Sequence, residues 1–226
     1  RLRIGLQCGR SGKLVFALVL KELVGTMFGK CCLAIVGSVA LLASMVFGGD
    51  SPSAWVDPSI GTAATGHAFP GPCRPFGLVQ PSPDTGNGSW KYCSGYAWTD
   101  TSVRRFSQTH VSGTGQAGLG DVGILPFVGD IPDPQTASAP FAKSDERIEL
   151  GYYGVTLESG VKVEIAAGRR LARYRISFPA GSRGGVLLDF PWGLYRQKEY
   201  LPHLTTTCEV SRVGARRWVG SNHSEV

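Results

Sequence analysis

The fold class of this chain is decided by the stretch Gly154-Val155-Thr156-Leu157-Glu158-Ser159-Gly160-Val161-Lys162-Val163-Glu164-Ile165. Apolar and polar residues alternate on both sides of Ser159-Gly160, which is the two-residue period of a strand with one buried face. A Ser-Gly pair between two such runs predicts a β-hairpin with a two-residue turn. Because each strand has a single apolar face, a second sheet must cover it.

The same kind of signal recurs along the chain from Trp55 onward. Residues 57–126 are rich in Gly, Ser, Thr, Pro and aromatic residues, and no window there has the apolar period of a helix. Further strand candidates are Gly77–Gln80, Ser94–Trp98, Phe106–Val111, Val122–Val128, Arg173–Phe178, Val186–Phe190, Thr205–Val210 and Arg216–Val219. The sequence therefore predicts an all-β fold, an antiparallel β-sandwich, with Val161–Phe190 as its most regular part.

Composition favours a globular protein and gives no support for a nucleic-acid partner. Of the 226 residues, 42% are hydrophobic and 18% charged, and the formal net charge is +6. A surface that follows phosphates needs clustered cations that release counterions together. Here the basic residues are scattered or in small pairs such as Arg104-Arg105 and Arg169-Arg170. We interpret them as a solvated basic surface.

The cysteines do not indicate a metal site. None of the six forms a CxxC pair or a Cys/His cluster with zinc spacing. An exported protein would keep an odd number after removal of its leader, which allows one disulfide and one free thiol, in a pairing that the sequence leaves open. The six are Cys8, Cys31, Cys32, Cys73, Cys93 and Cys208.

Residues 27–54 have the order of a secretory signal peptide: Lys30, then an uncharged run from Cys31 to about Gly49, then small residues. At about 18 residues the run could also be a marginal transmembrane helix, but no basic stop-transfer cluster follows, so no stable membrane anchor is expected. Residues 1–26 lack an initiating Met and are interpreted as upstream read-through, with an amphipathic pre-segment as the alternative. We expect a β-sandwich domain over residues 55–226, incomplete at its C-terminus, in a secreted or periplasmic protein or at the cell surface.

Four dense segments carry candidate chemistry. They hold His, Arg, Trp and hydroxyl groups among glycines, and loops of that kind on a rigid sheet are common binding sites. Aromatic faces with fixed polar partners suit a sugar, whose C–H faces stack on rings and whose hydroxyls need hydrogen bonds. The segments are Val56–Thr62, Gly66–Pro72, Arg74–Thr85, and Ser94–Tyr96 together with Phe106–Gly115.

In this order the segments resemble the amino-terminal domain of glycoside hydrolase family 92. The family pattern is close to VDPFIGT, GHTFPGA, PFGMVQLSPDT, a W-x-x-CSGY turn and FSHTHLSGTG followed by GD; here Trp90–Tyr96 matches the turn and Gly120-Asp121 the closing pair. The resemblance covers about residues 55–226. It implies a calcium-dependent inverting exo-α-mannosidase acting on mannose-containing glycans, with the β-sandwich followed by an (α/α)6 barrel that this chain does not contain.

The resemblance also implies where the reaction takes place. In the family both catalytic carboxylates lie in the helical domain, so no catalytic residue is assigned here, and most calcium ligands are expected there too. Asp84, Asp100, Asp121 and Asp189 are interpreted mainly as turn or cap residues. The expected substrate-binding residues are His67, Phe69 and Arg74 in the first loop, Cys93, Ser94 and Tyr96 in the second, and His110 and Ser112 in the third.

Simpler interpretations compete with several of these assignments. His67 could be a loop-stabilising hydrogen bonder, Phe76 a core ring, and Arg74 the partner of Asp84. Gln108 stands where the family has the first His of HTH, which puts a role of that imidazole in question. The expected partners are a mannose-containing glycan and the missing helical domain. The alternatives are a stand-alone carbohydrate-binding β-sandwich without hydrolytic activity and a structural domain of a surface protein.

Overall fold

The computed structural model describes residues 51–113, 115, 118–194, 204–215 and 217–225. The chain divides into two units, Arg1–Ala54 and Trp55–Val226, and the 3-10 turn η1 (Pro52–Trp55) lies at their boundary. The predicted read-through segment and nearly all of the predicted signal peptide lie outside the described residues. Within the described ranges, no helix combines the length and hydropathy needed to cross a membrane.

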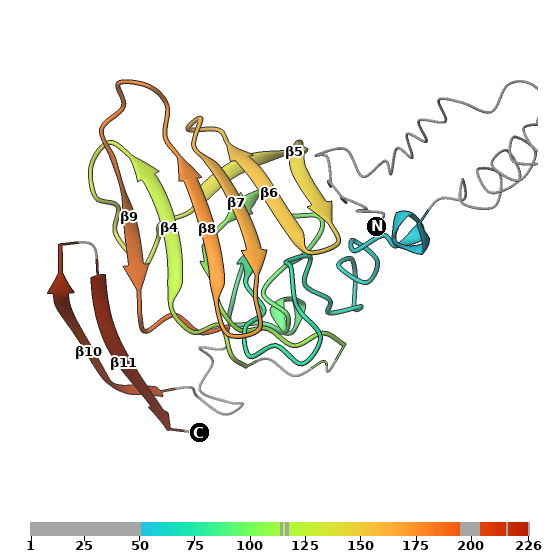
Figure 1. The fold of residues 1–226 in the computed structure, drawn as a ribbon, viewed down its shortest axis with the longest axis horizontal. Coiled ribbons are helices and arrows are strands. Elements are labelled where there is room, and N and C mark those ends of the chain that lie inside the picture. Colours follow the sequence, from blue (N-terminus) through green and yellow to red (C-terminus); the bar gives the residue numbers. More distant parts are fainter. Residues whose placement is uncertain (1–50, 114, 116–117, 195–203, 216, 226) are drawn as a thin grey trace, which may run out of the picture. The chain divides into compact units, whose positions relative to one another are not determined.

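The second unit contains two antiparallel sheets and a separate hairpin (Figure 1). The four-stranded sheet has the order β1-β3-β4-β9, the five-stranded sheet β2-β5-β6-β7-β8, and β10 pairs with β11. A short 3-10 turn, η2 (Trp90–Tyr92), precedes β2. The strands are β1 (Ser82–Asp84), β2 (Ser102–Val103), β3 (Arg105–Ser107), β4 (Gly123–Val128), β5 (Ala139–Glu149), β6 (Tyr152–Leu157), β7 (Lys162–Ala167), β8 (Ala172–Ser177), β9 (Gly184–Asp189), β10 (Leu204–Gly214) and β11 (Arg217–Glu225).

Both sheets contribute side chains to one apolar core, which confirms the predicted all-β antiparallel sandwich. Phe106 and Leu125 come from the four-stranded sheet, and Tyr153 and Val163 from the five-stranded sheet. Each aliphatic or aromatic side chain buried in this way stabilises the fold by about 1.5–3 kcal/mol. The other fully buried members include Val103, Phe141, Val155, Leu157, Val161 and Ile165.

The deciding hairpin is present, but its turn is one residue longer than predicted. The amide of Gly160 donates to the Leu157 carbonyl (2.8 Å), and the Leu157 amide donates to the Val161 carbonyl (2.9 Å). Gly160 has a φ of +80°, in the left-handed region that glycine adopts without strain. The connection is therefore a three-residue loop, in which a type I turn is followed by a left-handed glycine.

The other strand predictions are correct in part. The Val161–Phe190 stretch is a meander only through β8, because β9 pairs with β4 in the other sheet. Gly77–Gln80 and Ser94–Trp98 are loops, since their amides bond to other loops: Leu78 donates to the Arg169 carbonyl and Trp98 to the Thr62 carbonyl. The longest strand of the large sheet, β5, was not predicted. The pairing of β5 with β6 shifts register between Phe141 and Glu146.

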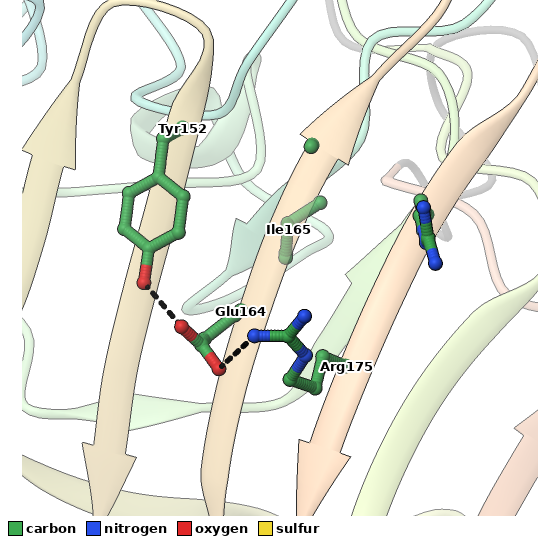
Figure 2. A pocket seen from close by; sticks show the side chains of 6 residues that line it. Tyr152, Glu164, Ile165 and Arg175 are labelled. Atoms are coloured by element: carbon green, nitrogen blue, oxygen red, sulfur yellow. Dashed lines mark hydrogen bonds and ion pairs between the residues drawn. The ribbon is translucent and has the colours of Figure 1, made fainter. Parts of the chain in front are cut away.

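The alternation of β7 leaves a polar outer face on the five-stranded sheet. Val163 and Ile165 point into the core, whereas Lys162 and Ala166 are exposed. A pocket opens on this face over β6, β7 and β8 (Figure 2), lined by Tyr152, Glu164, Ile165, Ala166, Arg173 and Arg175.

Candidate functional site

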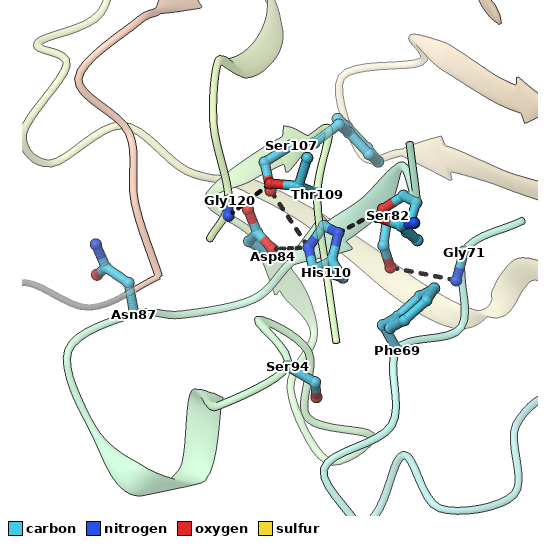
Figure 3. Close-up of polar contacts among 12 residues, drawn as sticks. Phe69, Gly71, Ser82, Asp84, Asn87, Ser94, Ser107, Thr109, His110 and Gly120 are labelled. Carbon is cyan, nitrogen blue, oxygen red and sulfur yellow. Dashed lines mark hydrogen bonds and ion pairs between the residues drawn. The ribbon is translucent and has the colours of Figure 1, made fainter. Parts of the chain in front are cut away.

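Both parts of the fourth sequence segment contact the short stretch His67–Phe69 of the second. The Gly113 amide donates to the His67 carbonyl (2.8 Å), and the Ser94 hydroxyl donates to the Ala68 carbonyl (3.2 Å). The Phe69 amide donates to the Ser112 hydroxyl, at a long 3.4 Å. Five of the eight predicted substrate-binding residues, His67, Phe69, Ser94, His110 and Ser112, are thereby held around one stretch of backbone. Figure 3 shows Phe69, Ser94 and His110 among them.

His67 is a buried imidazole whose polar atoms are unused. Its side chain is 94% buried, being 6% exposed, and neither ring nitrogen has a hydrogen-bond partner in the described part of the chain. Its φ of +48° is uncommon for a residue with a side chain. A buried polar group left unpaired costs about 1–3 kcal/mol, so this ring is the candidate in these loops for a hydrogen bond to a group outside the described residues. The loop-stabilising interpretation of the imidazole is not supported by these contacts.

Trp90 forms the aromatic surface beside His67. The two rings meet edge to face, with centroids 4.9 Å apart and planes 79° apart. The indole is 62% exposed, and a Cβ atom on Gly115 would stand 2.8 Å from Cη2 of its ring. The glycine therefore lets the loop after Ser112 approach the indole. Trp90 was recognised only as part of the W-x-x-CSGY turn; its exposure next to a glycine-rich loop is what marks it as a binding residue.

His110 is fully hydrogen-bonded inside the domain (Figure 3). Its Nδ1 lies 2.6 Å from the Gln80 carbonyl, and its Nε2 lies 2.8 Å from Oδ1 of Asp84 and 3.2 Å from the Ser107 hydroxyl. Since a carbonyl oxygen only accepts, Nδ1 donates to Gln80, and one proton is then held between Nε2 and the carboxylate. The ring presents its face to Phe69, at 5.3 Å between centroids. His110 thus positions Phe69.

A buried network of charged side chains lies behind His110 and holds it through Asp84. Oδ2 of Asp84 accepts the indole N–H of Trp192 (2.7 Å), and the Arg105 guanidinium lies 4.9 Å from the centroid of the same indole. Arg105 is completely buried and pairs with Asp189, with Nη2 and Oδ2 2.8 Å apart. The turn-or-cap interpretation of Asp84 and Asp189 is therefore wrong: both are buried carboxylates that are bound by cations or N–H groups.

The second loop turns two of its predicted residues inward. The phenol of Tyr96 donates to Oε2 of Glu146 (2.8 Å) and accepts from Lys143 (2.6 Å). Burial, and then the charge of Glu146, raise the pKa of Tyr96 well above its usual value. Burial also raises the pKa of the Cys93 thiol, which is 3% exposed. In this arrangement Tyr96 ties the second loop to β5 of the five-stranded sheet, and Cys93 stays a neutral thiol.

Arg74 and Phe76 lie apart from the His67–Phe69 contacts. Arg74 is exposed on a turn in which its carbonyl accepts the Gly77 amide (2.9 Å). It does not pair with Asp84, whose oxygens are bound by His110 and Trp192. Phe76 is fully exposed, with a φ of +56°, so the core-ring interpretation of Phe76 is wrong.

Gln108, the departure from the family's HTH motif, serves inside the domain. Its amide nitrogen donates to the Val122 carbonyl (3.2 Å), and its amide oxygen accepts the Tyr174 hydroxyl (3.2 Å). Tyr174 belongs to β8 of the five-stranded sheet. The side chain therefore connects the third loop to the opposite sheet.

The described residues do not offer a calcium site. No three His, Cys, Asp or Glu side chains within the described ranges come together to hold a metal ion. Calcium requires six to eight oxygen ligands, whereas the carboxylates of Asp84, Asp189 and Asp121 are bound by His110, Arg105 and Thr109. We therefore derive no step through calcium from these residues.

An antiparallel sandwich whose loops gather an unpaired imidazole, an exposed indole and hydroxyl groups has the features of a ligand-binding domain. The family model of the glycosyl hydrolase family 92 N-terminal domain matches residues 55–225. The chain therefore belongs to glycosyl hydrolase family 92, through its N-terminal domain.

Three relatives illustrate the similarity. A family GH92 α-mannosidase from Bacteroides thetaiotaomicron, solved in complex with mannoimidazole, has a TM-score of 0.60 and 32% identity over 63% of this chain and 20% of its own. A GH92 inverting mannosidase from the same species has a TM-score of 0.54 and 29% identity over 62% of this chain and 20% of its own. An "Uncharacterized secreted glycosidase" of Arthroderma benhamiae is 33% identical over 135 residues, 55% of this chain and 17% of its own. The chain thus spans about a fifth of the length of these relatives.

Proposed function

We propose that this domain forms one wall of the mannose-binding site of a secreted, inverting exo-α-mannosidase. The single observation that carries the proposal is the unpaired imidazole of His67 beside the largely exposed indole of Trp90, in loops that hydrogen-bond to one another. The indole provides a surface for the C–H groups of a pyranose, and the two nitrogens of His67 serve its hydroxyls. The printed names of the similar structures supply the substrate class.

In this proposal the acid and base of the reaction lie outside the described residues. An inverting glycosidase needs a protonated carboxylic acid and a carboxylate base roughly 6.5–9.5 Å apart, with a water between them. The buried carboxylates of this domain have internal partners instead: Asp84 holds His110, Asp189 holds Arg105, and Glu146 holds Tyr96 and Tyr153. The role left to the domain is binding and orientation of the sugar.

Secretion and calcium dependence belong to the same proposal. The name of the Arthroderma relative supports secretion, together with the predicted signal peptide of residues 27–54. Calcium dependence rests on the family resemblance, and the ion would be held mainly by residues outside this domain.

Two measurements on the 226-residue chain test the proposal. Methyl α-mannoside should bind weakly in an NMR titration, and Trp90→Ala should weaken this binding by about 2- to 10-fold, as expected for an aromatic contact worth about 0.5–1.5 kcal/mol. The control is Trp218→Ala in β11, which removes an indole of similar exposure, 58%. In parallel, an aryl α-mannoside should not be hydrolysed by the chain.

The outcomes are distinguishable. Equal effects of Trp90→Ala and Trp218→Ala would disprove the assigned wall. Release of mannose by this chain alone would show that the catalytic carboxylates have been misplaced. A third outcome is that Trp90→Ala weakens binding but the full-length protein does not hydrolyse mannosides. This result would favour the stand-alone carbohydrate-binding alternative.

A further inference from the structure

The pocket on the outer face of the five-stranded sheet has a construction of its own, and it shares no residue with the His67 and Trp90 loops. Strand register places two rows of residues across β6, β7 and β8: Tyr152, Ala166 and Arg173 in one row, and Gly154, Glu164 and Arg175 in the other. Each row has a small residue where its neighbours are large. The hollow has a volume of about 240 Å³, which is below the range of drug-sized sites and suits a single sugar ring.

Because Gly154 has no side chain, the Tyr152 ring can lie against the sheet at one side of the pocket. A Cβ atom on Gly154 would stand 2.6 Å from the Tyr152 hydroxyl oxygen and 3.0 Å from Cε1 and Cζ of its ring. The phenol therefore lies across the glycine, and looking onto the sheet one sees the ring face-on (Figure 2). Its hydroxyl donates to Oε1 of Glu164 (3.0 Å), which fixes the ring in this position.

Ala166 lies between Tyr152 and Arg173 in its row, and its small side chain leaves a space between theirs. Neighbouring strands are about 4.8 Å apart, so the backbones of Tyr152 and Arg173 are separated by about 10 Å across the exposed Ala166. That spacing leaves room over Ala166 for a pyranose ring beside the edge of the phenol, whose ring also lies under the Arg147 guanidinium at 5.3 Å from its centroid.

The charges around the hollow are predominantly positive. Oε2 of Glu164 lies 3.8 Å from Arg175 and its Oε1 lies 3.3 Å from Lys162, so this carboxylate is already compensated. The Arg175 side chain is nevertheless 75% exposed. Arg173 is exposed, and its guanidinium has no ion-pair or hydrogen-bond partner among the residues that the structure describes. Two guanidinium groups two residues apart on one strand present N–H donors to the same side.

We propose that this outer-face pocket binds a sugar that carries an anionic group, a carboxylate or a phosphate. The pyranose lies over Ala166 beside the Tyr152 phenol, the anion pairs with Arg173 and Arg175, and Glu164 accepts a sugar hydroxyl. Guanidinium groups recognise both anions through paired N–H bonds. This inference goes beyond the proposed function, because it adds a second ligand class and does not depend on mannoside binding.

The test is an NMR titration of the 226-residue chain with four probes: methyl glucuronide, glucose 6-phosphate, methyl glucoside and inorganic phosphate. We expect the Tyr152 ring signals to shift with the first two and to shift little with the last two. Arg173→Ala should weaken binding at least tenfold, about 1.4 kcal/mol. Ala166→Leu should abolish binding without any change of charge, because it fills the hollow. Comparison of the glucuronide with the sugar phosphate shows which anion is preferred.

Arg183→Ala is the matched control, since it removes the same charge from an exposed turn between β8 and β9. Binding should be unchanged in this variant. The melting temperatures of the Arg173 and Ala166 variants should stay at the wild-type value, because both side chains are exposed. The proposal is overturned if inorganic phosphate binds as tightly as the sugar phosphate, if the neutral glucoside binds equally well, or if Arg183→Ala weakens binding as much as Arg173→Ala.

Discussion

Arg105→Met should be among the most destabilising single substitutions in this domain. The guanidinium is completely buried, pairs with Asp189, and donates to the Ala137 carbonyl (3.2 Å) and to the carbonyls of Arg104 and Pro134. Removing it leaves the carboxylate of Asp189 buried without its cation, which costs about 3–5 kcal/mol. That is a large share of the roughly 5–15 kcal/mol that stabilises an ordinary domain.

The assay is urea denaturation of the 226-residue chain, followed by the fluorescence of its tryptophans. One of them, Trp192, lies directly against the Arg105 guanidinium. The control is Arg147→Met, which breaks the exposed Arg147–Glu149 pair (2.7 Å) and should cost no more than about 1 kcal/mol. Arg105→Met with Asp189→Leu should recover much of the loss, because no unpaired charge then remains. A loss below about 1 kcal/mol for Arg105→Met alone would refute the reasoning.

Three shorter predictions follow from other parts of the domain. Phe76→Asn should increase the free energy of unfolding by about 0.5–1 kcal/mol and reduce aggregation, because the ring is fully exposed and Asn tolerates a φ of +56°; a loss of stability measured by denaturation would show that the ring is packed. Hydrogen bonding from Tyr152, then the nearby charge of Lys162, lowers the pKa of Glu164; Tyr152→Phe should therefore raise it in an NMR titration. In the wild type, the stabilisation that comes from ionised Glu164 is present above the pKa of this carboxyl in the unfolded chain and is lost as the pH falls through its pKa in the folded chain. A Glu164 pKa that is the same in Tyr152→Phe and in the wild type would contradict the hydrogen bond. EDTA should leave the melting temperature of this chain unchanged, because no three His, Cys, Asp or Glu side chains among the described residues are grouped to hold a metal ion; a drop that calcium restores would contradict this expectation.

The sequence predicted the parts of the fold whose burial is local. The alternation in β6 and β7 was sufficient for the hairpin, because each residue's face follows from its neighbours along the strand. It was insufficient for β5, where charged residues from Lys143 to Arg147 interrupt the pattern. One of them, Glu146, is nearly buried because two tyrosine hydroxyls donate to it.

The same limit applies to the site. The order of the motifs identified the loops that meet at His67–Phe69, and the Gly113 and Ser112 contacts hold them there. The direction of each side chain was not predictable, since it depends on partners far away in the chain. Tyr96 is drawn inward by Glu146, 50 residues later, and Asp84 accepts from Trp192, 108 residues later.

The most direct test of the central claim is an NMR titration of histidine-labelled chain with methyl α-mannoside. The protein has four histidines, so the signals of His67 and His110 can be assigned by substitution. A saturable shift of the His67 ring signal with a nearly unchanged His110 signal is the predicted result, because the ring nitrogens of His67 have no partner among the described residues whereas those of His110 are hydrogen-bonded. A His67 signal that does not respond at saturating mannoside, or a response confined to His110, would contradict the account.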